Sequence, residues 1–225
     1  MKTPPFVMCM AATFGPAAVL ALGLAWAAES PARARPLFDG KTFAGWDGDT
    51  KKTWRIEDGS LVGGTLTKKQ PRNEFLATKK EYGDFVLTLK FKLLGDSTKT
   101  FVNSGVQIRS QRVKDSHEMI GYQADLGDGY WASIYDESRR NKVLAAADQK
   151  AMNKAINAGA WNKYVIRAEG RRIRTWINGK QGVDYTESDE KIPQVGRIGL
   201  QIHGGGPAEV WFKDIAIEEL PAKGR

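Results

Sequence analysis

The sequence is poor in cysteine and histidine, and this limits the chemistry that it can carry. Of 225 residues, one is cysteine and two are histidine. Cys9 lies in the N-terminal segment, so a disulfide framework in the rest of the chain is excluded. Cysteine and histidine clusters with the spacing of a zinc site are also lacking. We expect no cofactor and no metal. A calcium site formed by Asp125, Asp128 and backbone carbonyls is the alternative, which we disfavour because Asp-rich loops are common on β-sandwiches.

Repeats and low-complexity tracts are lacking as well. Residues 37–220 contain no second linker, which indicates one domain followed by a tail at residues 221–225. A chain of this length can bury a core without covalent staples. The segment Gly204-Gly205-Gly206 is not a phosphate loop, because no Lys-Ser/Thr pair follows it. It is more typical of a turn at the end of a strand.

The N-terminal residues have the pattern of a secretory signal peptide. An apolar stretch from Phe6 to Ala25 follows a basic start, and Ala25-Trp26-Ala27 offers a cleavage site of small residues. A membrane span is the alternative for this stretch, but Gly15-Pro16 interrupts it. We expect residues 1–27 to be a signal peptide and residues 28–36 a linker. The mature chain would then have no membrane span and would act in a periplasm, at a cell surface or outside the cell.

The chain is basic, with a net charge of +8. Its lysines and arginines are spread over many segments, and export argues against a nucleic-acid partner. We therefore expect a soluble basic surface, with attraction to an anionic envelope or polysaccharide as the alternative. The sequence carries no prediction of the oligomeric state.

Alternating apolar and polar residues predict strands along most of the chain. Residues 85–93 read as a long half-buried strand. Residues 164–169 and 173–177 read as a hairpin, and Asn178-Gly179 is a strong signal for the next tight turn. Many short strands at this length predict an all-β protein, a two-sheet jelly-roll sandwich.

Three further expectations concern local structure. The phase of the apolar residues shifts near Asp214, which predicts a β-bulge there. Residues 145–157 are the one helical candidate, which we interpret as a loop with one helical turn. Large aromatic residues are more often core than ligand platforms, and we expect this of four tryptophans: Trp46, Trp54, Trp161 and Trp211.

Three segments alternate apolar residues with residues that bind ligands: 102–109, 121–126 and 197–203. Successive side chains of a strand point to opposite faces, so neighbouring strands would join one polar face. Solvated faces are usually Lys, Glu, Thr and Ser, whereas amides, a carboxylate, a histidine and guanidiniums with glycines between them indicate a bound polar ligand. The side chains of this predicted face are Asn103, Gln107, Arg109, Gln123, Asp125, Arg197, Gln201 and His203.

Several stretches occur together in the order and spacing of a known family. They are LFDGK with GW (37–46), WRIEDGSL (54–61), YGDF (82–85), NSGV (103–106), WNKY (161–164), NG (178–179), GLQIHG (199–204) and FKDIAIEEL (212–220). Together they resemble the 3-keto-disaccharide hydrolase domain family. The resemblance implies a concanavalin A-like jelly roll of the lectin and glucanase type, export, and activity on glycosides whose sugar ring carries a ketone at C3.

A ketone at C3 makes the hydrogen at C2 acidic, so a base can remove it and the aglycone can leave from C1. This route needs a base, a donor to the enolate oxygen and an acid at the leaving oxygen, but not paired carboxylates. We expect an enzyme that cleaves a glycoside or oligosaccharide by elimination and hydration, or by direct hydrolysis. A non-catalytic, lectin-like carbohydrate-binding module on the same fold is the alternative.

Four side chains are the expected catalytic residues. His203 is the first choice for base or acid, because an unperturbed imidazole titrates at about 6.5. Arg109 would hold the enolate or sugar oxygens with its planar fork. Asp125 would fix ring hydroxyls or serve as the base. Glu137 would be the second carboxylate for proton transfer, with Arg140 as its modulator.

The other expected substrate contacts are amides, aromatic rings and one further carboxylate. For each, a structural role in the core, at a strand end or in a surface ion pair is the alternative. His117, in a turn-like segment, is given no role. The expected contacts are Asn103, Gln107, Gln123, Gln201, Tyr135, Trp131, Arg140 and Glu74.

Overall fold

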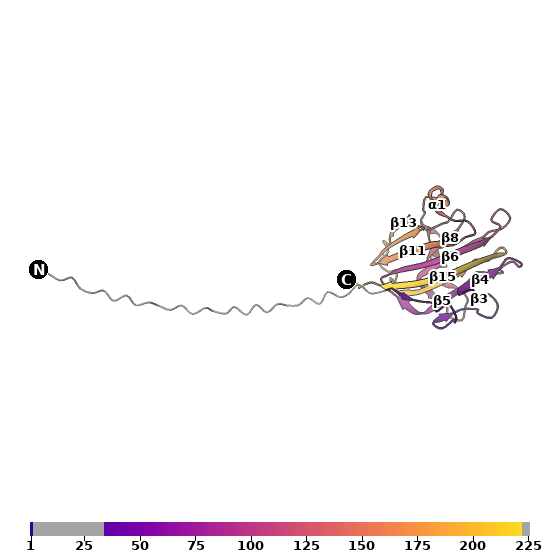
Figure 1. The fold of residues 1–225 in the computed structure, drawn as a ribbon, viewed down its shortest axis with the longest axis horizontal. Coiled ribbons are helices and arrows are strands. Elements are labelled where there is room, and N and C mark those ends of the chain that lie inside the picture. The colour runs from indigo at the N-terminus through magenta and orange to yellow at the C-terminus, as the bar shows by residue number, and fades with distance from the viewer. Residues whose placement is uncertain (2–33, 222–225) are drawn as a thin grey trace. The chain divides into compact units, whose positions relative to one another are not determined.

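The computed structural model describes Met1 and residues 34–221. The expected signal peptide after Met1, most of the expected linker and residues 222–225 lie outside the described residues. The described chain forms two antiparallel β-sheets packed face to face (Figure 1). None of its helices has the length and hydropathy needed to cross a membrane.

The first sheet has a central pair of long strands, β6 and β15. Its strand order, with β1 (Arg35–Pro36) added beside β15, is β13 (Lys180–Thr186), β12 (Arg172–Ile177), β11 (Asn162–Glu169), β6 (Phe85–Gly95), β15 (Ala208–Glu219), β4 (Ser60–Thr65) and β3 (Trp54–Glu57).

The second sheet contains the three segments of the predicted polar face as neighbours. Its strand order is β10 (Val143–Ala145), β9 (Ile134–Glu137), β8 (Met119–Gly127), β7 (Asn103–Arg112), β14 (Gly196–Ile202), β5 (Glu74–Tyr82) and β2 (Trp46–Asp47). The prediction that residues 102–109, 121–126 and 197–203 lie side by side is confirmed.

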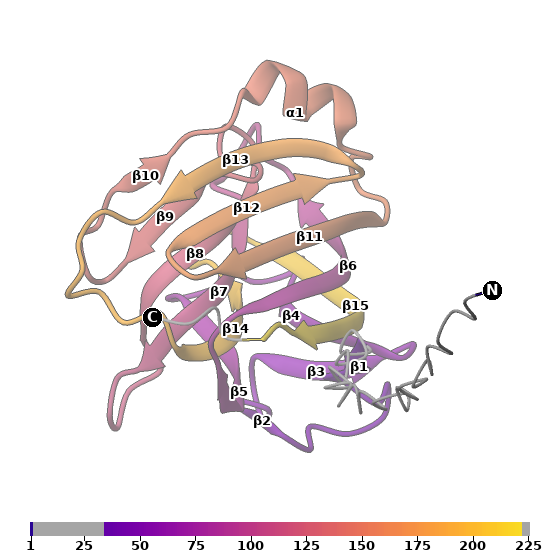
Figure 2. The ribbon, with the colours of Figure 1, turned by 90° about the vertical axis from the view of Figure 1, so that its left-hand side faces the viewer.

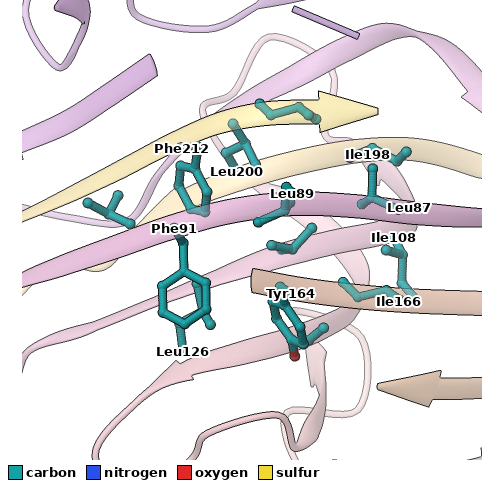
Figure 3. Packing of buried hydrophobic residues seen from close by; sticks show 14 of the residues in the cluster. Leu87, Leu89, Phe91, Ile108, Leu126, Tyr164, Ile166, Ile198, Leu200 and Phe212 are labelled. Atoms are coloured by element: carbon teal, nitrogen blue, oxygen red, sulfur yellow. The ribbon is translucent and has the colours of Figure 1, made fainter. Parts of the chain in front are cut away.

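The core lies between the two sheets (Figure 3). Alternate side chains of each strand point inward, so Leu89 and Phe91 of β6 meet Leu126 of β8 and Leu200 of β14. These side chains are fully buried. Burial of about 25 cal/mol per Å² of apolar surface makes this layer the main source of stability. The outer faces of the two sheets are thereby left for other functions.

The turns follow the predicted chemistry. Asn178 and Gly179 have φ angles of 49° and 81°, which a two-residue hairpin turn requires. The bulge is confirmed, because the pairing of β15 with β6 shifts between Lys213 and Ala216. The helix α1 (Gln149–Ala155) is longer than the single expected turn, and Asp148 caps it by accepting the Ala151 amide at 3.1 Å.

The expectation for the tryptophans is wrong at two positions. Trp46 and Trp54 belong to the core between the sheets. Trp211 is buried, but it alternates with the core residues Val210 and Phe212, so its ring lies on the outer side of the first sheet, beneath Lys92. Trp161 is half-buried on the outer side of the first sheet, because it precedes Asn162, whose side chain is buried. Its ring faces the ammonium group of Lys213 and not the core.

Candidate active site

A chain of hydrogen bonds crosses the outer side of β7 and β8. Gln107 Nε2 donates to Gln123 Oε1 at 3.0 Å, and Gln123 Nε2 donates to Asp125 Oδ1 at 2.8 Å. Ser110 Oγ donates to Gln107 Oε1 at 2.5 Å. All four side chains are buried. The period of two places Gln107, Gln123 and Asp125 on one face, as the sequence predicts. Ser110 joins them because the pairing of β7 shifts after Ile108.

The second sheet is concave on this side. Gln201 Nε2 on β14 donates to Glu137 Oε2 on β9 at 3.3 Å, although β7 and β8 lie between the two strands. Three strand spacings in a flat sheet would separate these strands by roughly 14 Å. The side chains can meet only because the sheet curves toward them. We call this hollow the polar face and define it by Gln107, Gln123, Asp125, Tyr135, Glu137 and Gln201.

Burial raises the pKa of both carboxyl groups of the polar face. It raises the pKa of Glu137 to about 7, and the nearby Glu118 carboxylate adds to the shift, while the hydrogen bond from Gln201 opposes it. Burial also raises the pKa of Asp125 to about 8. The hydrogen bond from Gln123 lowers this pKa, and the nearby Glu137 carboxylate raises it further. Near neutral pH Asp125 therefore keeps its proton and Glu137 is about half protonated. The protonated form is the state that a general acid requires.

His203 follows β14 at the end of the polar face. Its backbone N–H donates to the Asn103 carbonyl at 3.2 Å, and its Nδ1 contacts the Gly204 carbonyl oxygen. A carbonyl only accepts, so we assign the proton to Nδ1 and the free lone pair to Nε2. Burial lowers the pKa of His203 below 6.5, although the Gly204 carbonyl and Glu118 oppose this. A neutral imidazole with a bare nitrogen can act as a base.

An aromatic wall stands beside His203. The Phe101 ring meets the imidazole edge to face, with centroids 4.8 Å apart, and the Tyr130 ring lies 6.1 Å from Phe101. Phe101 is 45% exposed and Tyr130 38% exposed, so both present apolar surface to solvent. Gly206 permits this arrangement, because a Cβ there would come within 2.5 Å of Thr100.

Sequence reasoning missed Phe101 and Glu118. Phe101 is an apolar residue at the end of a polar turn just before β7, which is a usable signal for an exposed contact. Glu118 lies just before β8 in a segment without periodicity, and nothing in the sequence marks it.

The structure brings most of the expected residues to one place. Tyr135 pairs with Gln123 across β9 and β8 and is half-buried. Asn103 is buried at the start of β7. The expected residues found on or beside the polar face are Asn103, Gln107, Gln123, Asp125, Tyr135, Glu137, Gln201 and His203.

The placement of Arg109 on the polar face is wrong. A bulge shifts the pairing of β7 after Ile108, and Arg109 has a φ of 49°. Its guanidinium is fully buried and binds Asp84 Oδ1 at 2.7 Å and Gln194 Oε1 at 2.7 Å. It also donates to the carbonyls of Gly83 and Gly170. Arg109 thus joins turns of both sheets and is not available to a substrate.

Arg140 does not modulate Glu137. Its guanidinium binds two other carboxylates, Asp136 and Glu187, the latter at 2.6 Å. Asp136 has the opposite strand parity from Glu137, so its side chain and its arginine partners lie on the other side of β9. These carboxylates raise the pKa of Arg140, together with their hydrogen bonds. The pairing fixes the segment that follows β9.

Trp131 and Glu74 also differ from expectation. Trp131 packs against the core and stacks on Phe91 of the first sheet, 6.1 Å between centroids, so its ring is not on the polar face. Glu74 is buried, pairs with Arg72 at 2.8 Å, and lines a neighbouring cavity of about 440 Å³ together with His117. No residue of the polar face lines that cavity.

Within the described residues, no group of three or more His, Cys, Asp or Glu side chains is arranged to hold a metal ion.

We expect the stability of the protein to fall with rising pH because of Asp125. An unfolded aspartate has a pKa of about 3.9, whereas Asp125 titrates at about 8 in the fold. Its contribution to the free energy of unfolding is therefore complete below about pH 4 and is lost as the pH rises through 8. Asp125→Asn should remove this dependence and should be the more stable protein at pH 8.5, by on the order of a few kcal/mol.

Urea unfolding at pH 4.5 and pH 8.5 measures this difference. Asp58→Asn is the matched control, since Asp58 is an exposed turn residue with a φ of 47° that asparagine tolerates. Parallel pH profiles for the wild type and Asp125→Asn would show that Asp125 is ionised in the fold.

Comparison with known proteins points to carbohydrate. A model of the 3-keto-alpha-glucoside-1,2-lyase-like domain matches residues 33–218. A Parabacteroides distasonis protein named "putative glycosyl hydrolase" is 22% identical, with a TM-score of 0.62 over 82% of this chain and 93% of that chain. The carbohydrate-binding module CBM66 from Bacillus subtilis is 16% identical, with a TM-score of 0.58 over 78% and 96%.

The Bacillus licheniformis β-glucanase is 9% identical, with a TM-score of 0.51 over 86% of this chain and all of that chain. At these identities the likenesses show the fold alone. The prediction of a concanavalin A-like jelly-roll sandwich is confirmed. No curated protein matches the chain significantly.

Proposed function

Because the chain belongs to the 3-keto-alpha-glucoside-1,2-lyase-like domain family, we propose that it cleaves glucosides with a ketone at C3. The observation that carries the proposal is a carboxyl group of the polar face, Glu137, on the same concave sheet as an imidazole at the end of that face, His203. The pKa of Glu137 is raised to about 7 and that of His203 is lowered, so acid and base forms coexist near neutral pH. A surface that only bound sugar would have no need of this pair.

The first step is proton removal from C2. The Nε2 lone pair of His203 takes the proton, and the electron pair of the C2–H bond moves into an enolate whose charge rests on the C3 oxygen. Asp125, protonated below about pH 8, and the Asn103 amide are the donors that stabilise this oxygen. Arg109 takes no part, since its donors are occupied elsewhere.

The second step is loss of the aglycone. Glu137 gives its proton to the leaving oxygen as the C1–O bond breaks and the C1=C2 bond forms. The products are the alcohol and an unsaturated 3-keto sugar. Hydration reverses the order: the Glu137 carboxylate takes a proton from water, hydroxide adds at C1, and His203 returns a proton to C2. Proton balance is restored after one turnover.

The sugar ring is held between the aromatic wall and the polar face. Phe101 offers an exposed apolar surface to the C–H face of a ring, beside the base. Tyr135 and Glu137 are the half-buried side chains of the polar face and can contact the ligand directly. The buried glutamines beneath them fix these positions through their own hydrogen bonds.

A carbohydrate-binding module is the second candidate. The exposed pair Phe101 and Tyr130 suits a sugar-binding surface without catalysis, and the CBM66 fold is similar. An enzyme would cleave the 3-keto-glucoside, whereas a binding module would bind it without cleavage. One experiment distinguishes the two.

The experiment follows methyl 3-keto-α-glucoside by NMR in D₂O with and without the protein. We expect methanol release, with one solvent deuteron at C2 of the hydrated product. Methanol release without deuterium above the protein-free control would indicate direct hydrolysis. Binding without release would favour the module.

The pH dependence of kcat/KM should be bell-shaped. The base must be deprotonated, so activity rises as His203 loses its proton below pH 6.5. The acid must be protonated, so activity falls as Glu137 loses its proton at about 7. We expect the maximum at slightly acidic pH. In Glu137→Gln the alkaline limb of the residual activity should move up to about pH 8, where Asp125 loses its proton. If the limb stays where it is in the wild type, a group other than Glu137 causes it.

A further inference from the structure

Three lysines oppose one another across the outer side of the first sheet. Strands β11, β6 and β15 lie side by side in this sheet (Figure 2). Lys163 of β11 pairs with Lys90 of β6, and Lys90 pairs with Lys213 of β15. Like charges directly opposite in a sheet are destabilising. Lys90 is compensated by Asp214 at 2.9 Å. Among the described residues, no carboxylate pairs with Lys163 or Lys213. The fold thus keeps positive charge where stability alone disfavours it.

A row of tryptophan and lysine lies beside these lysines. Trp211 of β15 pairs with Lys92 of β6. Trp161 lies just before β11, whose first residue, Asn162, pairs with Phe91 of β6. The Lys92 Nζ is 4.2 Å from the Trp211 ring centroid and 5.3 Å from that of Trp161. The Lys213 Nζ is 4.1 Å from the Trp161 centroid. These cation–π contacts fix the ammonium groups, so little conformational entropy is lost when an anion binds.

We propose that this surface binds an acidic polysaccharide. We call it the lysine face and define it by Lys90, Lys92, Lys163, Lys213, Trp161 and Trp211. The Cα atoms of Lys163, Lys90 and Lys213 follow a line across the strands at spacings of about 4.8 Å, which is close to the length of one sugar ring in an extended chain. Carboxylates or sulfates along such a chain would meet successive ammonium groups, and the half-buried indole of Trp161 would contact ring C–H groups. Trp211 is buried and serves to hold Lys92 in place.

A lipid surface fits this face less well. None of the exposed large apolar side chains in the described chain belongs to it, and insertion into a membrane interface requires such side chains. The face also lies on the opposite side of the sandwich from the polar face, with the core between them. Binding here would leave the candidate active site free, so the inference stands apart from the proposed cleavage.

The test is affinity electrophoresis of the full chain in gels that contain polygalacturonate, with dextran as the neutral polymer. The variant is Lys92→Gln/Lys163→Gln/Lys213→Gln. The matched control, Lys41→Gln/Lys51→Gln/Lys150→Gln, removes the same charge from exposed positions elsewhere. We expect the wild type and the control to bind polygalacturonate, and the lysine-face variant to bind about tenfold more weakly or not at all. Salt at 1 M should abolish binding, because the Debye length falls to about 3 Å.

Equal retardation of the variant and its control would overturn the inference, as would equal retardation in dextran. Binding of phosphatidylserine vesicles through the same lysines, without binding of polygalacturonate, would also overturn it. Removal of opposed charges should not lower the melting temperature. If the triple variant fails to fold, Lys213→Gln against Lys51→Gln decides the question in the same gels. Cleavage of a small 3-keto-glucoside should be unchanged in the lysine-face variant.

Discussion

Arg109→Met should destabilise the protein by about 3–5 kcal/mol, which is the cost of leaving a buried partner charge uncompensated. The guanidinium is fully buried and holds four acceptors: Asp84, Gln194 and the carbonyls of Gly83 and Gly170. Each would lose its donor. Because domains of this kind have only about 5–15 kcal/mol of stability, the variant should unfold at a markedly lower temperature.

Thermal unfolding followed by circular dichroism measures this effect. Arg172→Met is the matched control, because Arg172 forms a surface ion pair with Asp184 and is half-exposed; it should change the melting temperature little. If Arg109→Met folded normally and lost only activity, Arg109 would be a substrate ligand, as the strand alternation alone predicts.

Loss of either proton-transfer group should have the largest effect on catalysis. His203→Gln and Glu137→Gln should each lower kcat for 4-nitrophenyl 3-keto-α-glucoside by about 10²–10⁴-fold, the usual contribution of a positioned acid or base. The good leaving group of this substrate needs less protonation, so the Glu137→Gln defect should be smaller than with the methyl glycoside.

Two comparisons separate chemistry from folding. Glu190→Gln makes the same change at an exposed position and should keep full activity. Melting temperatures of His203→Gln and Glu137→Gln should be at or above that of the wild type, since both positions are unfavourable for charge. Full activity in both catalytic variants would show that the active site lies in another part of the molecule.

Strand periodicity is sufficient to place Gln107, Gln123, Asp125 and Gln201, because side chains alternate strictly in regular strands. It fails at Arg109, where one bulge reverses the direction of the side chain. The glycine at position 196 was a usable signal of this bulge. A Cβ on Gly196 would lie 2.4 Å from the Arg109 carbonyl carbon, and isolated glycines in strands are typical of bulges.

Other features depend on contacts that no local pattern encodes. Trp131 is an aromatic residue near a polar segment, but its ring stacks on Phe91 from the other sheet. Glu118 acts through space on Glu137 and His203, which are distant in sequence. The raised pKa of Asp125 comes from burial by surrounding segments, so the residue type alone cannot predict it.

The most direct test of the account is the titration of Glu137 in the intact protein. Carbon-13 NMR of side-chain carboxyls, with Glu137→Gln to assign the signal, gives its pKa without any substrate. If Glu137 is the neutral acid, the midpoint should lie near 7. A midpoint near 4.5, the ordinary value for glutamate, would mean that the hollow holds no neutral acid at physiological pH, and the proposed chemistry would fail with it.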